Sequence, residues 1–124
     1  MNLSPQRFAD TVVVTPAGRI DQSSSEAFGT ALAPYLDRCA PDKDRLVLDL
    51  SKLEYISSAG LRVLMLAARQ VKKQSGTLVV SGLQAPIEEI FQISRFTMIF
   101  TITPTLREAL AKASAAALAE LEQA

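Results

Sequence analysis

Two adjacent serines, Ser57 and Ser58, are the residues of this 124-residue chain best placed for chemistry. They stand in the segment Tyr55-Ile-Ser-Ser-Ala-Gly-Leu-Arg62, just before a run of residues with helical spacing. The first turn of a helix has unpaired backbone N–H groups and the positive end of the helix dipole. A serine there can cap the helix or hold a phosphate group, and capping is the commoner role.

The other residue types argue against enzyme chemistry. The chain has no histidine, which excludes a Ser-His-Asp triad, a histidine base and histidine-ligated metals within it. Its single cysteine, Cys39, excludes an internal disulfide and a CxxC zinc site. Neither serine lies in a G-x-S-x-G motif, and no phosphate-binding GxxxxGK[ST] loop is present. Asp21 and Asp49 lie near the ends of predicted strands and could pair as carboxylates, but such residues more often cap turns. We therefore expect no enzyme, no catalytic residue, no metal and no cofactor.

Composition narrows the class of protein further. A chain of 124 residues with 48% apolar residues fits one domain, spanning residues 1–124, with a single core. Thirteen basic and thirteen acidic residues cancel, which argues against binding nucleic acid through bulk charge. No apolar stretch reaches the ~18 residues of a membrane span, and the first residues do not resemble a signal peptide. We expect a soluble, cytoplasmic protein that does not insert into membranes.

The two serines lie between a predicted strand and a predicted helix. Leu46, Val47, Leu48 and Leu50 predict a buried strand. After Gly60, apolar residues with helical spacing predict an amphipathic helix, at Leu61, Leu64, Met65, Ala68 and Val71. The basic residues Arg62, Arg69, Lys72 and Lys73 are expected on its solvated face, with docking of an acidic partner as the alternative. Gln74-Ser-Gly76 ends this helix, and Thr77–Ser81 predicts a parallel strand joined by a right-handed crossover.

The N-terminal part predicts strands and a first helix. Val12-Val-Val14 predicts a strand, and Arg19-Ile20 predicts a short second strand. We expect the two to form an early hairpin or one bent edge strand. Ser23-x-x-Glu26 matches a capping box before apolar residues with helical spacing. Pro34 falls inside that pattern, so we expect a kink or a break near Ala33.

The C-terminal part predicts two more helices and one strand. Pro86 suits the first position of a short helix, and Met98–Ile102 predicts a strand. Thr105-x-x-Glu108 matches a capping box for a long, alanine-rich last helix that runs to about residue 122, and that we expect to fray or contact a partner after Ser114. The predicted fold class is α/β, with a small mixed sheet of about four to five strands and about four helices packed on it.

The segment Leu48-Asp-Leu-Ser…Tyr55-Ile-Ser-Ser-Ala-Gly-Leu-Arg-Val-Leu64 resembles the signature of STAS domains, in particular the bacterial anti-sigma factor antagonists. Gly18-Arg-Ile-Asp21 is similar to the family's Gly-x-Leu-Asp turn, and the resemblance spans roughly residues 8–112. It implies a single STAS-like domain in which the serine two residues before the glycine, Ser58, is phosphorylated. The residues implied to shape the site are Asp21, Asp49 and Gly60. Those expected to contact the partner are Tyr55, Ile56, Ser57, Ala59 and Arg62.

The chain departs from the family pattern at three positions. Family members often carry Asp before the phosphorylated serine and Ser or Thr after it, whereas this chain has Ser57 and Ala59. Ser57 is therefore a second candidate acceptor. Ser94-Arg95-Phe96 stands where the family usually has Ser-Gly-Leu, which bears on the turn after a later helix.

The resemblance also implies a regulatory circuit. An unphosphorylated antagonist binds an anti-sigma factor that is also a serine kinase and thereby frees a sigma factor. The kinase phosphorylates the antagonist, and a PP2C-type phosphatase restores it. The main alternative is a STAS subunit that assembles with a membrane transporter or a stressosome-like scaffold. A nucleotide-binding or hydrolysing domain is a third alternative, which would bind ATP or GTP in a manner dependent on Asp21 or Asp49.

Overall fold

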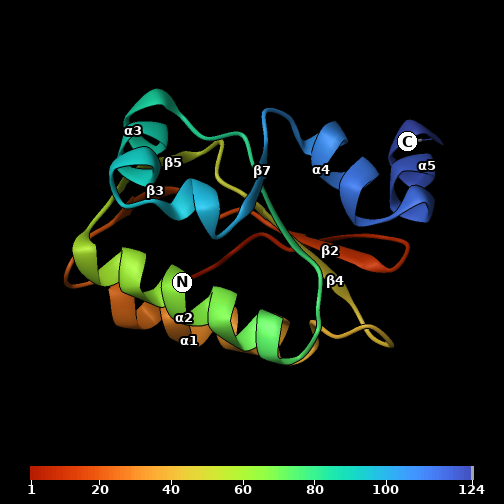
Figure 1. The fold of residues 1–124 in the computed structure, drawn as a ribbon, viewed down its shortest axis with the longest axis horizontal. Coiled ribbons are helices and arrows are strands. Elements are labelled where there is room, and N and C mark those ends of the chain that lie inside the picture. Colours follow the sequence, from red (N-terminus) through yellow and green to blue (C-terminus); the bar gives the residue numbers. More distant parts are fainter. Residues whose placement is uncertain (124) are drawn as a thin grey trace.

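The computed structural model describes residues 1–123, which form two sheets and the helices that cover them (Figure 1). The larger sheet has the strand order β1 (Gln6–Phe8), β2 (Thr11–Val14), β4 (Arg45–Asp49), β6 (Leu78–Ser81) and β7 (Thr101–Thr103). Its first pair is antiparallel and the other neighbours are parallel. A separate parallel pair joins β3 (Gly18–Ile20) to β5 (Leu53–Ile56). The predicted α/β class with a small mixed sheet is therefore confirmed.

Helices cover both faces of the larger sheet. The helices are α1 (Ser25–Asp37), α2 (Ser58–Lys73), α3 (Ala85–Ile93), α4 (Leu106–Ala113) and α5 (Ala115–Gln123), with a short 3₁₀ helix, η1 (Phe96–Met98), after α3. In Figure 1, α1 and α2 lie together on one side of the sheet, and α4 and α5 lie on the other.

The buried strands divide their side chains between two cores. Val12, Val14 and Leu48 pack with the residues of α1 and α2, whereas Val13 and Val47 pack with α4 and α5. This alternation is what the two-residue period of a strand dictates when both faces are covered. It also explains why the strand segments have continuous apolar runs rather than polar and apolar residues in turn.

Several sequence expectations about the helices are wrong. Helix α1 continues through Pro34, which is exposed, so a break near Ala33 is wrong, whereas the alternative of a kink stays a prediction. Ser24 caps α1, without a side-chain bond to the helix, so the predicted Ser23–Glu26 box does not form. The predicted strand from Met98 starts too early, since Met98 belongs to η1 and β7 begins at Thr101.

The alanine-rich C-terminus forms two helices instead of one. Ser114 leaves helical geometry, with φ −167° and ψ 127°, and its hydroxyl accepts a hydrogen bond from the N–H of Ala117 at 3.2 Å. Ala117 is fully buried in the core that includes Phe8 of β1. The predicted single helix is therefore wrong, whereas the expectation that the part after Ser114 frays or contacts a partner stays a prediction. The capping of α4 by Thr105 is confirmed, since its hydroxyl accepts from the N–H of Glu108 at 3.2 Å.

An ion-pair cluster at the opposite end of β4 from the serines gives a testable pH dependence. Arg7 donates to both oxygens of the Asp44 carboxylate at 3.0 Å, and Arg38 donates at 3.1 Å. The Arg7 hydrogen bonds, and then that of Arg38, hold the pKa of Asp44 below its usual value. A depressed pKa adds stability that is fully present above the unfolded pKa of about 3.9 and is lost as the pH falls through the folded pKa.

We expect Asp44→Asn to lower the free energy of unfolding by about 1–2 kcal/mol at pH 7, and the difference from wild type to vanish toward pH 2. Both arginines are more than half exposed, so solvent screening keeps the effect in this range. Urea unfolding between pH 7 and pH 2 measures it. Asp42→Asn, at an exposed position of the same loop, is the control. A difference that stays constant with pH would contradict the assignment.

Candidate functional site

The Ser57–Ser58 step lies where β3 and β5 end together. The two strands run parallel, with Ile20 opposite Ile56, and the N–H of Ser57 donates to the carbonyl of Ile20 at 2.8 Å. Helix α2 begins at the next residue, Ser58. The strand pair therefore fixes the position of the first turn of α2.

The two serines have different surroundings. Ser57 has extended geometry and is 9% exposed, and its hydroxyl accepts a hydrogen bond from the N–H of Gly60 at 3.2 Å. It is the N-cap of α2. Ser58 is exposed, and among the hydrogen bonds of residues 1–123 none involves its hydroxyl. From the sequence, either serine could be the cap or the accessible hydroxyl. In the structure Ser57 is the cap and Ser58 has the accessible hydroxyl.

We expect Ser57→Ala to lower the free energy of unfolding by about 1 kcal/mol, because it leaves the Gly60 N–H without its acceptor. Ser58→Ala is the matched comparison and should change stability by less than about 0.5 kcal/mol, since an exposed hydroxyl without a partner is removed. Urea unfolding of both variants measures the difference. A larger loss in Ser58→Ala than in Ser57→Ala would reverse the assignment of the cap.

Gly60 allows the start of α2 to lie directly against the strand pair. A Cβ at this position would lie 2.6 Å from Cγ1 of Ile56 and 2.9 Å from Cγ2 of Ile20. Both isoleucines are in the core, and Ile56 is 2% exposed. The expectation that Ile56 belongs to the partner-binding surface is therefore corrected, because its side chain supports the helix start from inside.

Ser58 borders a shallow hollow of about 300 Å³ between α2 and the end of α3. The other residues that line it are Leu61, Arg62, Met65, Ser94 and Phe96. Arg62 lies one helical turn after Ser58 and is exposed. Met65, Ser94 and Phe96 could not be placed at the site from the sequence, because nothing local indicates that the chain returns there.

The departure from the family pattern at Arg95 falls at this hollow. Arg95 has φ +61° and ψ 24°, the left-handed conformation that favours glycine. It joins Ser94 to Phe96, both of which line the hollow beside Ser58. The Ser94-Arg95-Phe96 segment therefore forms part of the wall of the hollow as well as the turn after α3.

Asp21 directly follows β3 and accepts hydrogen bonds within the turn that precedes α1. Its carboxylate accepts from the Ser23 hydroxyl at 2.7 Å and from the N–H groups of Ser23 and Ser24 at 3.0 Å. The hydrogen bond from the Ser23 hydroxyl, followed by those from Ser24, lowers the pKa of Asp21. Its negative charge is thus held near the start of α2 by its own turn.

Asp49 has a different environment. It ends β4 in the larger sheet, opposite Ser81 of β6, and its carboxylate accepts from the N–H of Ser51 at 3.0 Å. Within residues 1–123 no hydrogen bond joins Asp49 to Ser57 or Ser58. Its predicted role in shaping the site stays a prediction.

Tyr55 and Ala59, two further residues predicted to contact a partner, differ in their surroundings. Tyr55 is 36% exposed, and the Arg19 guanidinium lies over its ring, 4.3 Å from the ring centroid. Ala59, beside Ser58, is half-buried. Arg62 lines the hollow beside Ser58, whereas Tyr55 does not, and the contacts that both residues are predicted to make with a partner stay predictions.

Other kinds of site have less support in the described residues. Residues 1–123 contain no group of three or more His, Cys, Asp or Glu side chains arranged to hold a metal ion. Cys39 is fully buried, and burial raises the pKa of its thiol, which disfavours the reactive thiolate. No helix within this range has the length and apolar character that crossing a bilayer requires.

Comparison with known proteins finds a family match, a relative that is similar in sequence, and solved structures with the same fold. A family described as "Mlab, STAS domain" matches residues 4–107. BtrV of Bordetella bronchiseptica, provisionally named an anti-sigma factor antagonist, is 36% identical over 118 residues, which cover 95% of this chain and 98% of BtrV. The crystal structure of an anti-sigma factor antagonist from Mycobacterium paratuberculosis has a TM-score of 0.78 at 24% identity, over 88% of this chain and 90% of that one. The phosphorylated form of the Bacillus cell fate determinant SpoIIAA has a TM-score of 0.66 at 15% identity, over 90% and 98%. Both structures share this fold.

Proposed function

The chain belongs to the STAS domain family, and from this premise we propose that it is an anti-sigma factor antagonist controlled by phosphorylation of Ser58. In its unphosphorylated form it binds an anti-sigma factor that is also a serine kinase. The kinase transfers a phosphate to Ser58 and is released, and a PP2C-type phosphatase regenerates the binding form. The chain is then a substrate and a ligand in the circuit rather than a catalyst. The name of BtrV and the solved phosphorylated form of SpoIIAA support this proposal.

The exposure of Ser58 is the observation that carries the proposal. A kinase must reach the hydroxyl oxygen, and Ser58 is exposed at the first position of α2, whereas Ser57 is buried and holds the Gly60 N–H. Phosphorylation of Ser57 would remove the helix cap as well as require access to a buried group. Ser58 is therefore the acceptor that the local structure favours.

The helix start can accept the phosphate without refolding. A phosphoserine adds about −1.5 to −2 charges and three acceptor oxygens. The N–H groups of the first turn and the helix dipole stabilise negative charge there, and Arg62 is one turn away on the same hollow. A partner surface that covers Ser58 would instead have to bury that charge. The proposed switch thus acts on binding and leaves the fold unchanged.

The test is phosphorylation by a candidate kinase from the same genome. Wild type, Ser57→Ala and Ser58→Ala are incubated with ATP and the kinase, and intact mass with peptide mapping locates the phosphate. We expect one phosphate on wild type and Ser57→Ala and none on Ser58→Ala, with release of the kinase upon modification. If neither serine is modified and Ser58→Asp binds every partner as wild type does, the switch is wrong. The transporter or scaffold alternative then becomes the better one.

A further inference from the structure

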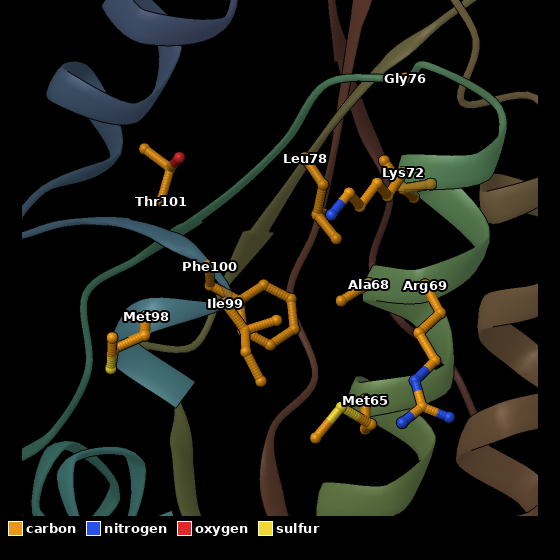
Figure 2. Close-up of a pocket in the computed structure, with 11 residues that line it drawn as sticks. Met65, Ala68, Arg69, Lys72, Gly76, Leu78, Met98, Ile99, Phe100 and Thr101 are labelled. Carbon is orange, nitrogen blue, oxygen red and sulfur yellow. The ribbon is translucent and has the colours of Figure 1, made fainter. Parts of the chain in front are cut away.

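A second depression lies beside the C-terminal half of α2, away from Ser58. It has a volume of about 610 Å³ and separates α2 from the segment formed by η1 and β7. Figure 2 shows Arg69 and Lys72 extending from α2 on one side and Ile99 and Phe100 facing them from the other. We call this depression the α2–β7 groove. Its apolar residues include Met65, Ala68, Leu78 and Phe100.

The helix that forms one wall is basic along its whole length. Helix α2 contains Arg62, Arg69, Lys72 and Lys73 and no acidic residue, although the chain as a whole has a formal net charge of zero. The ion pairs found within residues 1–123 use none of these four cations. Arg69 and Lys72 line the groove. Within residues 1–123, Arg69 and Lys72 are therefore free of ion pairs, and their positive charge is complementary to an acidic ligand.

The opposite wall presents apolar side chains to solvent. Met98 is 82% exposed and Ile99 is 43% exposed, and both line the groove. Large apolar side chains that gather in a groove with a charged rim are typical of protein-binding surfaces. Methionine suits such a surface, since its flexible thioether adapts to the shape of a bound chain. An occupant with one apolar face and acidic flanks matches both walls.

The groove adjoins the hollow beside Ser58. Met65 lines both depressions. Ser58, Arg62, Met65, Arg69 and Lys72 follow one another at spacings of four, three, four and three residues, so they share one face of α2. This face extends over about 21 Å at the helical rise of 1.5 Å per residue. A partner that covers Ser58 can therefore also reach the groove.

We propose that the α2–β7 groove binds an acidic, amphipathic segment of the same kinase that engages Ser58. This inference rests on the proposed function and adds a second contact, which lies outside the phosphorylated turn. Apolar residues of the segment pack between Ala68 and Phe100, and its carboxylates pair with Arg69 and Lys72. The contact contributes affinity and selects the partner by charge, while Ser58 determines whether the complex persists.

Paired variants test the groove separately from Ser58. Lys72→Glu and Met98→Asp change the groove, and Lys73→Glu and Leu66→Asp make the same chemical changes on α2 outside it. Leu66 is 51% exposed, and all four residues are exposed, so each variant should keep the wild-type Tm. Titration calorimetry measures the Kd of each unphosphorylated variant for the kinase. For each groove variant the Kd should be at least tenfold higher than that of wild type, and for each control it should lie within about twofold of that of wild type. Added salt should weaken the binding of the kinase to wild type more than its binding to Lys72→Glu.

The outcomes separate this inference from the proposed function. If the groove variants bind the kinase as the controls do, while Ser58→Asp still weakens binding, the groove inference is wrong and the proposed function stands. If wild type neither binds the kinase nor is phosphorylated, both are wrong. If phosphatidylglycerol vesicles bind wild type and not Lys72→Glu, while kinase binding is unaffected, the groove is a membrane-binding surface and the inference is overturned.

Discussion

Phosphorylation of Ser58 is expected to raise the Kd for the partner kinase by roughly two to three powers of ten, which corresponds to about 3–4 kcal/mol. The reason is that an interface formed over this exposed hydroxyl would have to desolvate a phosphate of about −1.5 to −2 charges. Titration calorimetry of the kinase with the purified phosphorylated and unphosphorylated chains measures the change. Ser58→Asp, which adds a single charge, should shift the Kd in the same direction by a smaller factor.

The same modification should leave stability nearly unchanged, with a Tm shift below about 2 °C, because the phosphate lies at the favourable end of the helix dipole. Ala119→Asp is the control for added charge, since this exposed position is on α5, which covers the other face of the sheet. It should bind the kinase as wild type does. If phosphorylation lowered the Tm strongly, the loss of binding would reflect unfolding, and a switch confined to the surface would be contradicted.

The central strand and helix could be predicted because their patterns are strong and local. The apolar run from Leu46 predicts β4, and the helical spacing after Gly60 predicts α2, which ends at Lys73 before the predicted stop at Gln74-Ser-Gly76. The parallel pairing of β4 with β6 is also confirmed. Burial of one helix face and of both strand faces leaves such patterns in any sequence that folds this way.

Strand β5 could not be predicted, because its burial does not alternate. Leu53 and Ile56 are buried, while Glu54 and Tyr55 between them are exposed. Such a segment has neither the two-residue period of a half-buried strand nor a continuous apolar run. Its strand geometry depends on pairing with β3, which is more than 30 residues earlier in the chain. Long-range pairing of this kind is visible only in the folded structure.

The roles at the candidate site depended on the same long-range pairing. The sequence placed two serines at a helix start, but the hydrogen bond from Ser57 to Ile20 and the burial of Ile56 decide which serine faces solvent. At the start of α1, likewise, Ser24 takes the N-cap position and Asp21 accepts from its N–H, so the predicted box does not form. Local motifs can be satisfied by several nearby side chains, so they predict where a cap lies better than which residue forms it.

The close contact between the ends of α1 and α2 predicts the largest effect on stability. Gly76 follows α2, and its N–H donates to the carbonyl of Val71 at 2.9 Å. A Cβ on Gly76 would lie 2.3 Å from the carbonyl oxygen of Cys39, at the end of α1. That oxygen accepts a hydrogen bond from the Gln74 side chain at 2.9 Å. The clash is with backbone that this hydrogen bond holds in place, so no rotamer change relieves it.

We expect Gly76→Ala to lower the free energy of unfolding by about 3 kcal/mol, since the two helix ends must separate to admit a methyl group. Gly29→Ala makes the same change inside α1, where the nearest atoms to the new Cβ are the Val63 methyls at 3.7 Å. It should raise stability by about 0.5–1 kcal/mol, because alanine favours a helix interior over glycine. Urea unfolding of both variants measures the opposite signs. If Gly76→Ala is as stable as wild type, the ends of α1 and α2 can separate without loss of stability, which contradicts the prediction. The backbone at Gly76, which also lines the α2–β7 groove, can then move to admit a methyl group.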